Sequence, residues 1–142
     1  MQPVERVRFP KNVPGPFYTL GFRFADGSGW RGECLACEAP EVEAPDLLAP
    51  LANGNYDTYF VKQPTTPEEI EEACRAIEVC CVVALRYGGT DPAIIKRLGN
   101  KPAFCDYLLT NDTLVYIGPP QPLAWWRRAI RWLRSLFAKN PA

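Results

Sequence analysis

The sequence predicts an α+β fold of short strands and two or three short helices, followed by an amphipathic helix at the C-terminus. Three observations support this class. Strand-like and helix-like segments follow one another in the order β, α, β, α, β. Fifteen prolines in 142 residues, about twice the usual share, divide the chain into short elements. Apolar residues make up 47% of the chain, which is enough to form a core.

The distribution of proline and glycine divides the chain into four parts. Residues 1–16 contain four prolines and one glycine, which predicts an irregular arm. Residues 17–117 carry the alternating strand and helix signals and form the predicted domain. Residues 118–122 read Gly-Pro-Pro-Gln-Pro, which predicts a linker, and residues 123–142 form the amphipathic helix.

The first half of the predicted domain is rich in strand signals. The aromatic run over 17–24 predicts a strand, and Asp-Gly-Ser-Gly after it predicts a turn. Residues 30–33 return as a second strand of the hairpin. Acids, alanines and prolines around two leucines predict a short helix within 38–50. Alternating Tyr, Thr, Phe and Val predict a strand over 56–62.

The clearest helix signal inside the domain begins at Thr66. Thr66 can cap the helix because Glu69 stands three positions later, and Pro67 suits the first helical position. This helix is predicted to run to about Val79.

Three shorter elements complete the predicted domain. The β-branched run over 82–87 predicts a strand that ends at a Gly-Gly pair. An Asp-Pro pair opens a helix over 91–99, and residues 113–117 read as a strand.

The composition excludes several classes of protein. The chain has no histidine, which removes Ser-His-Asp and Cys-His catalysis, Rieske ligation and Cys2His2 zinc sites. The longest apolar run has seven residues, so no transmembrane helix is predicted. We see no phosphate-binding loop, no catalytic carboxylate pair and no basic aromatic groove. The chain is therefore predicted not to be an enzyme and not to bind nucleic acid.

The six cysteines are the strongest indication of chemistry. Residues 1–6 lack a secretory signal, so cytoplasmic, reduced thiols are expected, which favours metal or cluster binding over disulfides. Cys34 and Cys37 form a C-x2-C pair on a loop after a strand, a pattern shared by zinc sites, redox dithiols and iron–sulfur clusters. Cys80 and Cys81 follow the predicted acidic helix.

From about Phe22 to Gly89 the chain resembles the single-cluster bacterial-type ferredoxins. Those proteins pair an early C-x2-C-x2-C motif with a later C-P-V-x-A-I segment, here Cys-Cys-Val-Val-Ala-Leu. The resemblance implies a ferredoxin-like small sheet, a 4Fe-4S or 3Fe-4S cluster and electron transfer to a redox partner protein. It also implies three ligands: Cys34, Cys37 and Cys80.

The motif departs from the family pattern at two positions. Pro40 stands where the third thiolate of the early motif would be, and Cys81 replaces the proline of the later segment. Cys81 is therefore a candidate for an additional ligand, although it can also be read as a core residue, as can Cys74. Two other interpretations stay open. One is a zinc site, and the other is a cluster-free binding or adaptor module, for example of the immunity type.

The C-terminal segment has the most regular pattern in the chain. Residues 123–142 contain five basic residues and no acidic one, so the remainder carries an excess of five acids. On a helical wheel, one half is apolar and the other basic. The predicted membrane or partner face includes Trp125, Trp126, Trp132, Leu136, Arg127 and Arg131. Such a helix suits peripheral contact with the inner face of a membrane, docking on its own domain, or binding to a partner protein.

Overall fold

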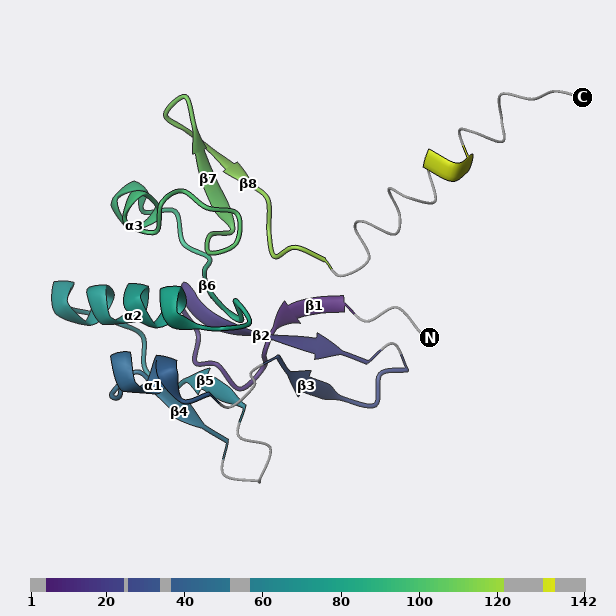
Figure 1. Ribbon diagram of the computed structural model, residues 1–142, viewed down its shortest axis with the longest axis horizontal. Coiled ribbons are helices and arrows are strands. Elements are labelled where there is room, and N and C mark those ends of the chain that lie inside the picture. Colours follow the sequence, from purple (N-terminus) through teal and green to yellow (C-terminus); the bar gives the residue numbers. More distant parts are fainter. Residues whose placement is uncertain (1–4, 25, 34–36, 52–56, 122–131, 135–142) are drawn as a thin grey trace, which may run out of the picture.

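The computed structural model describes residues 5–24, 26–33, 37–51, 57–121 and 132–134 (Figure 1). It is a mixed α+β fold with small antiparallel sheets and short helices, which confirms the predicted class. In chain order the elements are β1 Glu5–Arg8, β2 Phe17–Arg23, β3 Trp30–Gly32, α1 Ala39–Glu43, β4 Leu48–Pro50, β5 Thr58–Phe60, α2 Pro67–Val79, β6 Leu85–Tyr87, α3 Pro92–Arg97, β7 Tyr107–Thr110 and β8 Thr113–Tyr116.

Strand β2 is the centre of the main sheet. It pairs antiparallel with β1, β3 and β6. β3 pairs with the second half of β2, opposite Gly21 to Arg23, whereas β6 pairs with its first half, opposite Phe17 to Thr19. A strand from the start of the domain is thereby joined to one that follows α2, far along the sequence.

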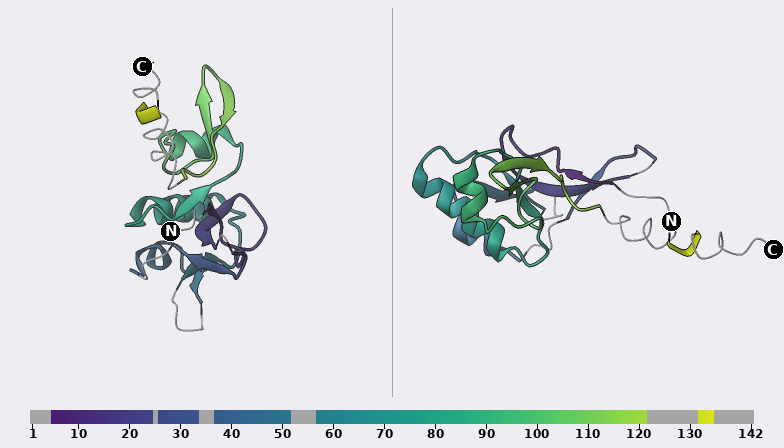
Figure 2. Two further views of the ribbon diagram at one scale, coloured as in Figure 1. Left: turned by 90° about the vertical axis from the view of Figure 1, so that its right-hand side faces the viewer. Right: turned by 90° about the horizontal axis from the view of Figure 1, so that it is seen from above.

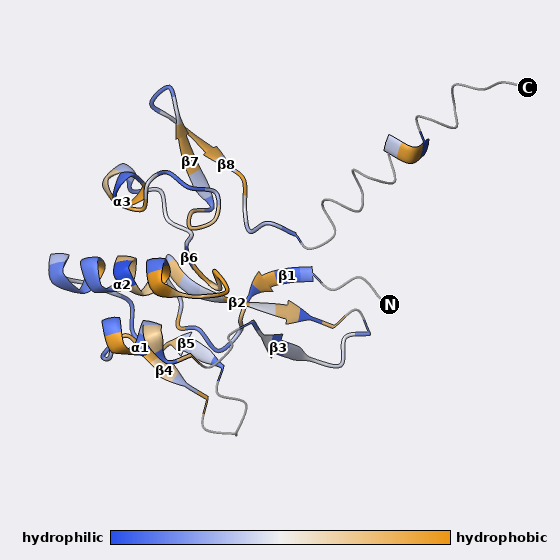
Figure 3. Ribbon diagram, in the orientation of Figure 1, coloured by the Kyte–Doolittle hydropathy of each residue, from blue (hydrophilic) through white to orange (hydrophobic). Residues whose placement is uncertain are grey.

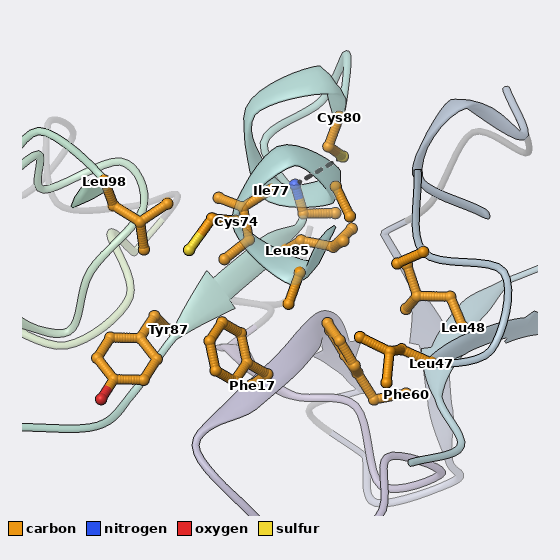
Figure 4. Packing of buried hydrophobic residues seen from close by; sticks show 14 of the residues in the cluster. Phe17, Leu47, Leu48, Phe60, Cys74, Ile77, Cys80, Leu85, Tyr87 and Leu98 are labelled. Carbon is orange, nitrogen blue, oxygen red and sulfur yellow. Dashed lines mark hydrogen bonds between the residues drawn. The ribbon is translucent and has the colours of Figure 1, made fainter. Parts of the chain in front are cut away.

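The hydrophobic core lies between this sheet, the β4–β5 hairpin and the inner face of α2. Figure 4 shows Phe17 of β2 beside Phe60 of β5, with Ile77 of α2 and Leu85 of β6 above them. The centroids of the Phe17 and Phe60 rings are 6.1 Å apart. α2 begins as predicted, because the side chain of Thr66 accepts the backbone N–H of Glu69 at 3.1 Å.

Helix α3 and the β7–β8 hairpin stand together on one side of α2 (Figures 1 and 2). They are tied to the sheet by Arg86 of β6, whose buried guanidinium donates to Asp106 at 2.7 Å. The same carboxylate accepts the hydroxyl of Tyr18 at 2.5 Å. The outer strand of the hairpin, β8, is apolar in Figure 3, and its side chains are exposed.

Several predicted boundaries are wrong. The arm over 1–16 is not irregular throughout, because residues 5–8 form β1 and pair with β2. Within 38–50, only Ala39–Glu43 is helical, and Leu48–Pro50 is strand β4. The strand predicted from residue 82 begins at Leu85 because a turn follows α2.

Other predicted elements are confirmed. The predicted ranges contain all of α2, α3 and β8. Strand β7 was not predicted. In the described part of the chain, no helix combines the length and apolar character needed to span a bilayer.

Candidate functional site

The two cysteine-bearing segments meet at one residue of β2, Leu20. The backbone N–H of Glu33 donates to the Leu20 carbonyl at 3.1 Å, and the Leu20 N–H donates to the Ala84 carbonyl at 2.7 Å. The N–H and C=O of one strand residue point to the same edge, so β3 and β6 follow one another along that edge of β2. Cys34 directly follows Glu33, and Cys81 precedes Ala84 by three residues. This bonding therefore brings the two segments together.

Arg6 of β1 adds a side-chain link between the same two segments. Its guanidinium makes two contacts of 2.6 Å with the Glu33 carboxylate, and it donates to the Val83 carbonyl at 3.2 Å. Both charged side chains are only 14% exposed. Sequence reasoning missed this residue because β1 was read as irregular. The four residues of β1, Glu-Arg-Val-Arg, contain one apolar side chain, so no alternation of apolar and polar residues marks the strand in the sequence.

A tight turn after α2 directs the thiol of Cys80 inward. Cys80 is the C-cap of α2, and its carbonyl accepts the N–H of Val83 at 3.2 Å. Val83 has φ 54°, which is rare for a β-branched residue. The turn lets the N–H of Ala84 donate to the Cys80 sulfur at 3.2 Å (dashed line in Figure 4). The buried Cys80 sulfur is thus an acceptor inside its own turn.

Cys37 and Cys81 are a pair of exposed thiols, one on each of the two segments. Interaction with the Cys37 thiol raises the pKa of Cys81 above its ordinary value. One predicted ligand, Cys37, and the additional candidate, Cys81, are therefore both open to solvent.

Pro40 occupies the position of the missing third thiolate. Cys37 is followed by Glu38, which caps α1 with a left-handed φ of 62°. Pro40 lies in the first turn of α1, where proline is favoured, and it is buried. The residue that replaces the third cysteine is thus part of the core.

Cys74 and Cys105 belong to the core and not to the thiol pair. Both are fully buried in the hydrophobic cluster, in agreement with the packing interpretation of Cys74. Burial raises the pKa of Cys74 to about 11 and also raises the pKa of Cys105. Because both thiols are enclosed by core side chains, neither is placed to join the exposed thiols of Cys37 and Cys81.

The predicted metal ligands are only partly brought together. Cys37, Cys80 and Cys81 are described, whereas Cys34 lies outside the described residues. Within the described ranges, no group of three or more His, Cys, Asp or Glu side chains could hold a metal ion. A metal centre at this site would need the thiolate of Cys34.

Two acidic side chains of α2 form ion pairs inside the domain. Glu69 forms an ion pair with Lys62, and hydrogen bonds from Lys62 and from the Thr65 backbone lower its pKa to about 2. Glu71 contacts Arg97 of α3 at 2.5 Å. These pairs tie α2 to Lys62 before it and to α3 after it.

Most of the predicted membrane or partner face lies outside the described residues: Trp125, Trp126, Arg127, Arg131 and Leu136. Trp132 is described, and it lies in the helical segment 132–134. Its side chain is 62% exposed, and that of Leu133 is 45% exposed.

Comparison with known proteins gives no independent guide to this site. No protein-family model, curated protein or solved structure matches the chain.

Proposed function

We propose that this chain is a ferredoxin-like electron-transfer protein whose iron–sulfur cluster is bound by thiolates from the two segments that meet at Leu20. The observation that carries the proposal is the backbone bonding at Leu20, which holds the strand end before Cys34 beside the turn that carries Cys80 and Cys81. These two cysteine-bearing segments are remote in sequence.

The order of elements supports this proposal. A strand leads to the Cys34 loop, and a short helix, a hairpin and a longer helix lead to Cys80. The chain then returns as β6, which pairs with the first strand of the series, β2. This is the arrangement that a centre bound from two loops requires, because the sheet fixes both loops relative to each other.

The donor chemistry also fits a cluster of this type. Iron–sulfur clusters take cysteine thiolates, and N–H groups directed at sulfur tune their potentials. Cys37 and Cys81 are exposed thiols, and the Cys80 sulfur already accepts the N–H of Ala84. With Cys34, these residues would supply four thiolates. When bound, a cluster supplies one-electron redox chemistry, while the chain's own residues hold it and orient the partner.

A cluster-free binding module is the second candidate. It is favoured by Pro40, which fills the third thiolate position and is buried at the start of α1. In this case the sheet and helices would be retained while the thiols had no cluster to bind.

Iron and sulfide analysis after anaerobic reconstitution distinguishes the two candidates. We expect the full chain to bind iron and sulfide in stoichiometric amounts, with the broad visible absorption of sulfide-to-iron charge transfer. Cys37→Ser and Cys81→Ser should each lose most of the iron, whereas Cys74→Ser, which changes a buried core thiol, should retain it. A folded but colourless and metal-free wild-type chain would overturn the electron-transfer proposal and favour the binding module.

A further inference from the structure

We infer that strand β8 is an interaction surface for a second copy of this chain, through antiparallel pairing of the two β8 strands about Val115. The inference uses none of the cysteines and does not depend on the proposed function. It rests on three features of the β7–β8 hairpin: its register, its open outer edge and the exposed apolar side chains along that edge.

The register of the hairpin determines which backbone groups of β8 face outward. Directly after β8, the N–H of Ile117 donates to the Asp106 carbonyl at 2.7 Å, so the backbone of Ile117 points towards the β7 side. Successive residues of an antiparallel strand direct their N–H and C=O groups to opposite edges. The backbone groups of Leu114 and Tyr116 therefore point away from β7.

The corresponding outer edge of β7 is already occupied. The N–H of Leu109 donates to the Asn100 side chain at 2.8 Å, and the Leu109 carbonyl accepts from the same side chain at 2.9 Å. Helix α3 also packs against β7 (Figure 1). Among the residues that the structure describes, none bonds to the outward backbone groups of Leu114 and Tyr116. The hairpin thus has one closed edge and one open edge.

The open edge lacks the features by which edge strands usually avoid pairing with other chains. Such strands carry charged side chains, proline or a bulge. Residues 113–117 contain neither a charged residue nor a proline, and β8 pairs with β7 without a bulge. Their four large apolar side chains are exposed to solvent: Leu114, Val115, Tyr116 and Ile117. β8 is therefore suited to gain a neighbouring strand.

A second copy of the chain would satisfy all of these outward groups in one register. With the two Val115 residues opposite each other on a two-fold axis, Leu114 of each chain lies opposite Tyr116 of the other. Each such pair can exchange both of its N–H···O=C bonds. Asp112 then lies opposite Gly118, so no like charges meet. A helix, such as the one predicted for the C-terminal segment, cannot supply these bonds, because its own backbone groups are bonded within it.

The test measures the mass of the full chain in reducing buffer by sedimentation equilibrium over the micromolar concentration range. We expect a reversible dimer with twice the 15.9 kDa mass of the chain. Val115→Lys and Val115→Glu should each weaken dimerisation by about tenfold or more, because two like charges then lie opposite each other. Since Val115 is 43% exposed, both variants should remain folded by circular dichroism.

A mixture of the two variants tests the register. It places opposite charges at the same point of the pairing, so we expect the mixture to dimerise more strongly than either variant alone. Val79→Lys is the matched control, because this valine at the end of α2 has a similar exposure of 39%. It should dimerise as the wild type does.

Three results would overturn the inference. The first is a wild-type chain that stays monomeric throughout the concentration range, as expected if its own C-terminal segment covers β8. The second is a folded Val115→Lys or Val115→Glu chain that dimerises like the wild type, which would place the dimer interface elsewhere. The third is a mixture that dimerises no more strongly than the single variants.

Discussion

Arg6 and Glu33 form a two-pronged ion pair, with Nε and Nη2 of the arginine each 2.6 Å from a carboxylate oxygen of the glutamate. The pair links β1 to the residue that immediately precedes Cys34, and Nη2 also reaches the carbonyl of Val83. A single guanidinium thereby contacts both segments of the candidate site. We infer that Arg6 is a positioning residue, since no contact joins it to a described thiol.

Replacement of this arginine should therefore loosen the site. Arg6→Ala leaves the half-buried Glu33 carboxylate without its partner, and we expect the free energy of unfolding to fall by about 2 kcal/mol. The loss should be visible in urea denaturation. We also expect this variant to retain less iron after reconstitution, because the two segments lose their common side-chain contact.

Arg23→Ala is the matched control for this prediction. Arg23 also pairs with a glutamate of the main sheet, Glu5, but both side chains are more than half exposed. Exposed ion pairs contribute about 0–1 kcal/mol, so this variant should stay close to the wild type in both measurements. Equal effects of the two substitutions would contradict a special role for Arg6.

Interactions between residues close in sequence explain the helix caps of this fold. They do not explain the strand pairing beside the candidate site. Thr66 and Asp91 cap their helices as the sequence predicts, because a cap depends on neighbours within a few residues. The sequence did not predict β1, because its four residues are too few and too highly charged to show an alternation of apolar and polar side chains. Pairing of β1 with β2 supplies the stability that the local pattern does not show.

The candidate site was predicted only in part for a similar reason. The spacing of Cys34 and Cys37 and the resemblance pointed to two segments that are bonded to the same residue of β2, but no pattern indicated that Cys80 is buried and Cys81 exposed. A reversal of the chain direction after α2 determines which of two adjacent thiols faces outward. The left-handed Val83 makes this reversal, and no sequence pattern predicts such a conformation for valine.

Val83 gives a direct test of the strain in that turn. Valine in the left-handed region costs about 1–2 kcal/mol, and glycine removes this cost while adding some freedom to the unfolded chain. We expect Val83→Gly to raise the free energy of unfolding by up to about 1 kcal/mol in urea denaturation. Val82→Gly is the control and should lower it, because Val82 packs against the core. A loss of stability in both variants would show that the turn holds no relievable strain.

Because the Cys74 thiol is buried, we expect the free energy of unfolding to depend on pH in the alkaline range. Its pKa is about 11 in the folded protein against 9.0 ordinarily, so the unfolded chain loses this proton first. The stabilisation is complete below pH 9 and is lost as the pH rises from 9 to 11. Between pH 9 and pH 11 the titration of this thiol lowers the free energy of unfolding by about 1.4 kcal/mol per pH unit.

Cys74→Ala should remove this part of the decline. Urea denaturation at a series of pH values between 8 and 11 measures it, and the slope is the relevant quantity because the substitution also changes packing. Ile77→Val, which changes packing in the same core without removing a titratable group, should leave the slope unchanged. An unaltered slope in Cys74→Ala would mean that the alkaline loss of stability comes from other buried groups, such as Tyr18, whose pKa is also raised.

The boundary for removing the C-terminal segment is set by Gln121. Its side chain accepts the backbone N–H of Arg6 at 2.9 Å and donates to the Arg6 carbonyl at 2.8 Å. A deletion of residues 122–142 therefore keeps the contact with β1 and removes only the predicted amphipathic helix.

We expect this deletion to abolish co-sedimentation with anionic vesicles and to leave the thermal unfolding midpoint unchanged. Full burial of a large apolar side chain contributes roughly 1.5–3 kcal/mol, and each basic residue near an anionic surface adds about 1 kcal/mol. Arg127→Glu with Arg131→Glu should weaken vesicle binding in the full chain while preserving the apolar residues.

If the helix instead docks on its own domain, the deletion lowers the unfolding midpoint and the intact chain stays in the supernatant. Full-length protein that does not sediment with anionic vesicles at low salt would therefore exclude the membrane role.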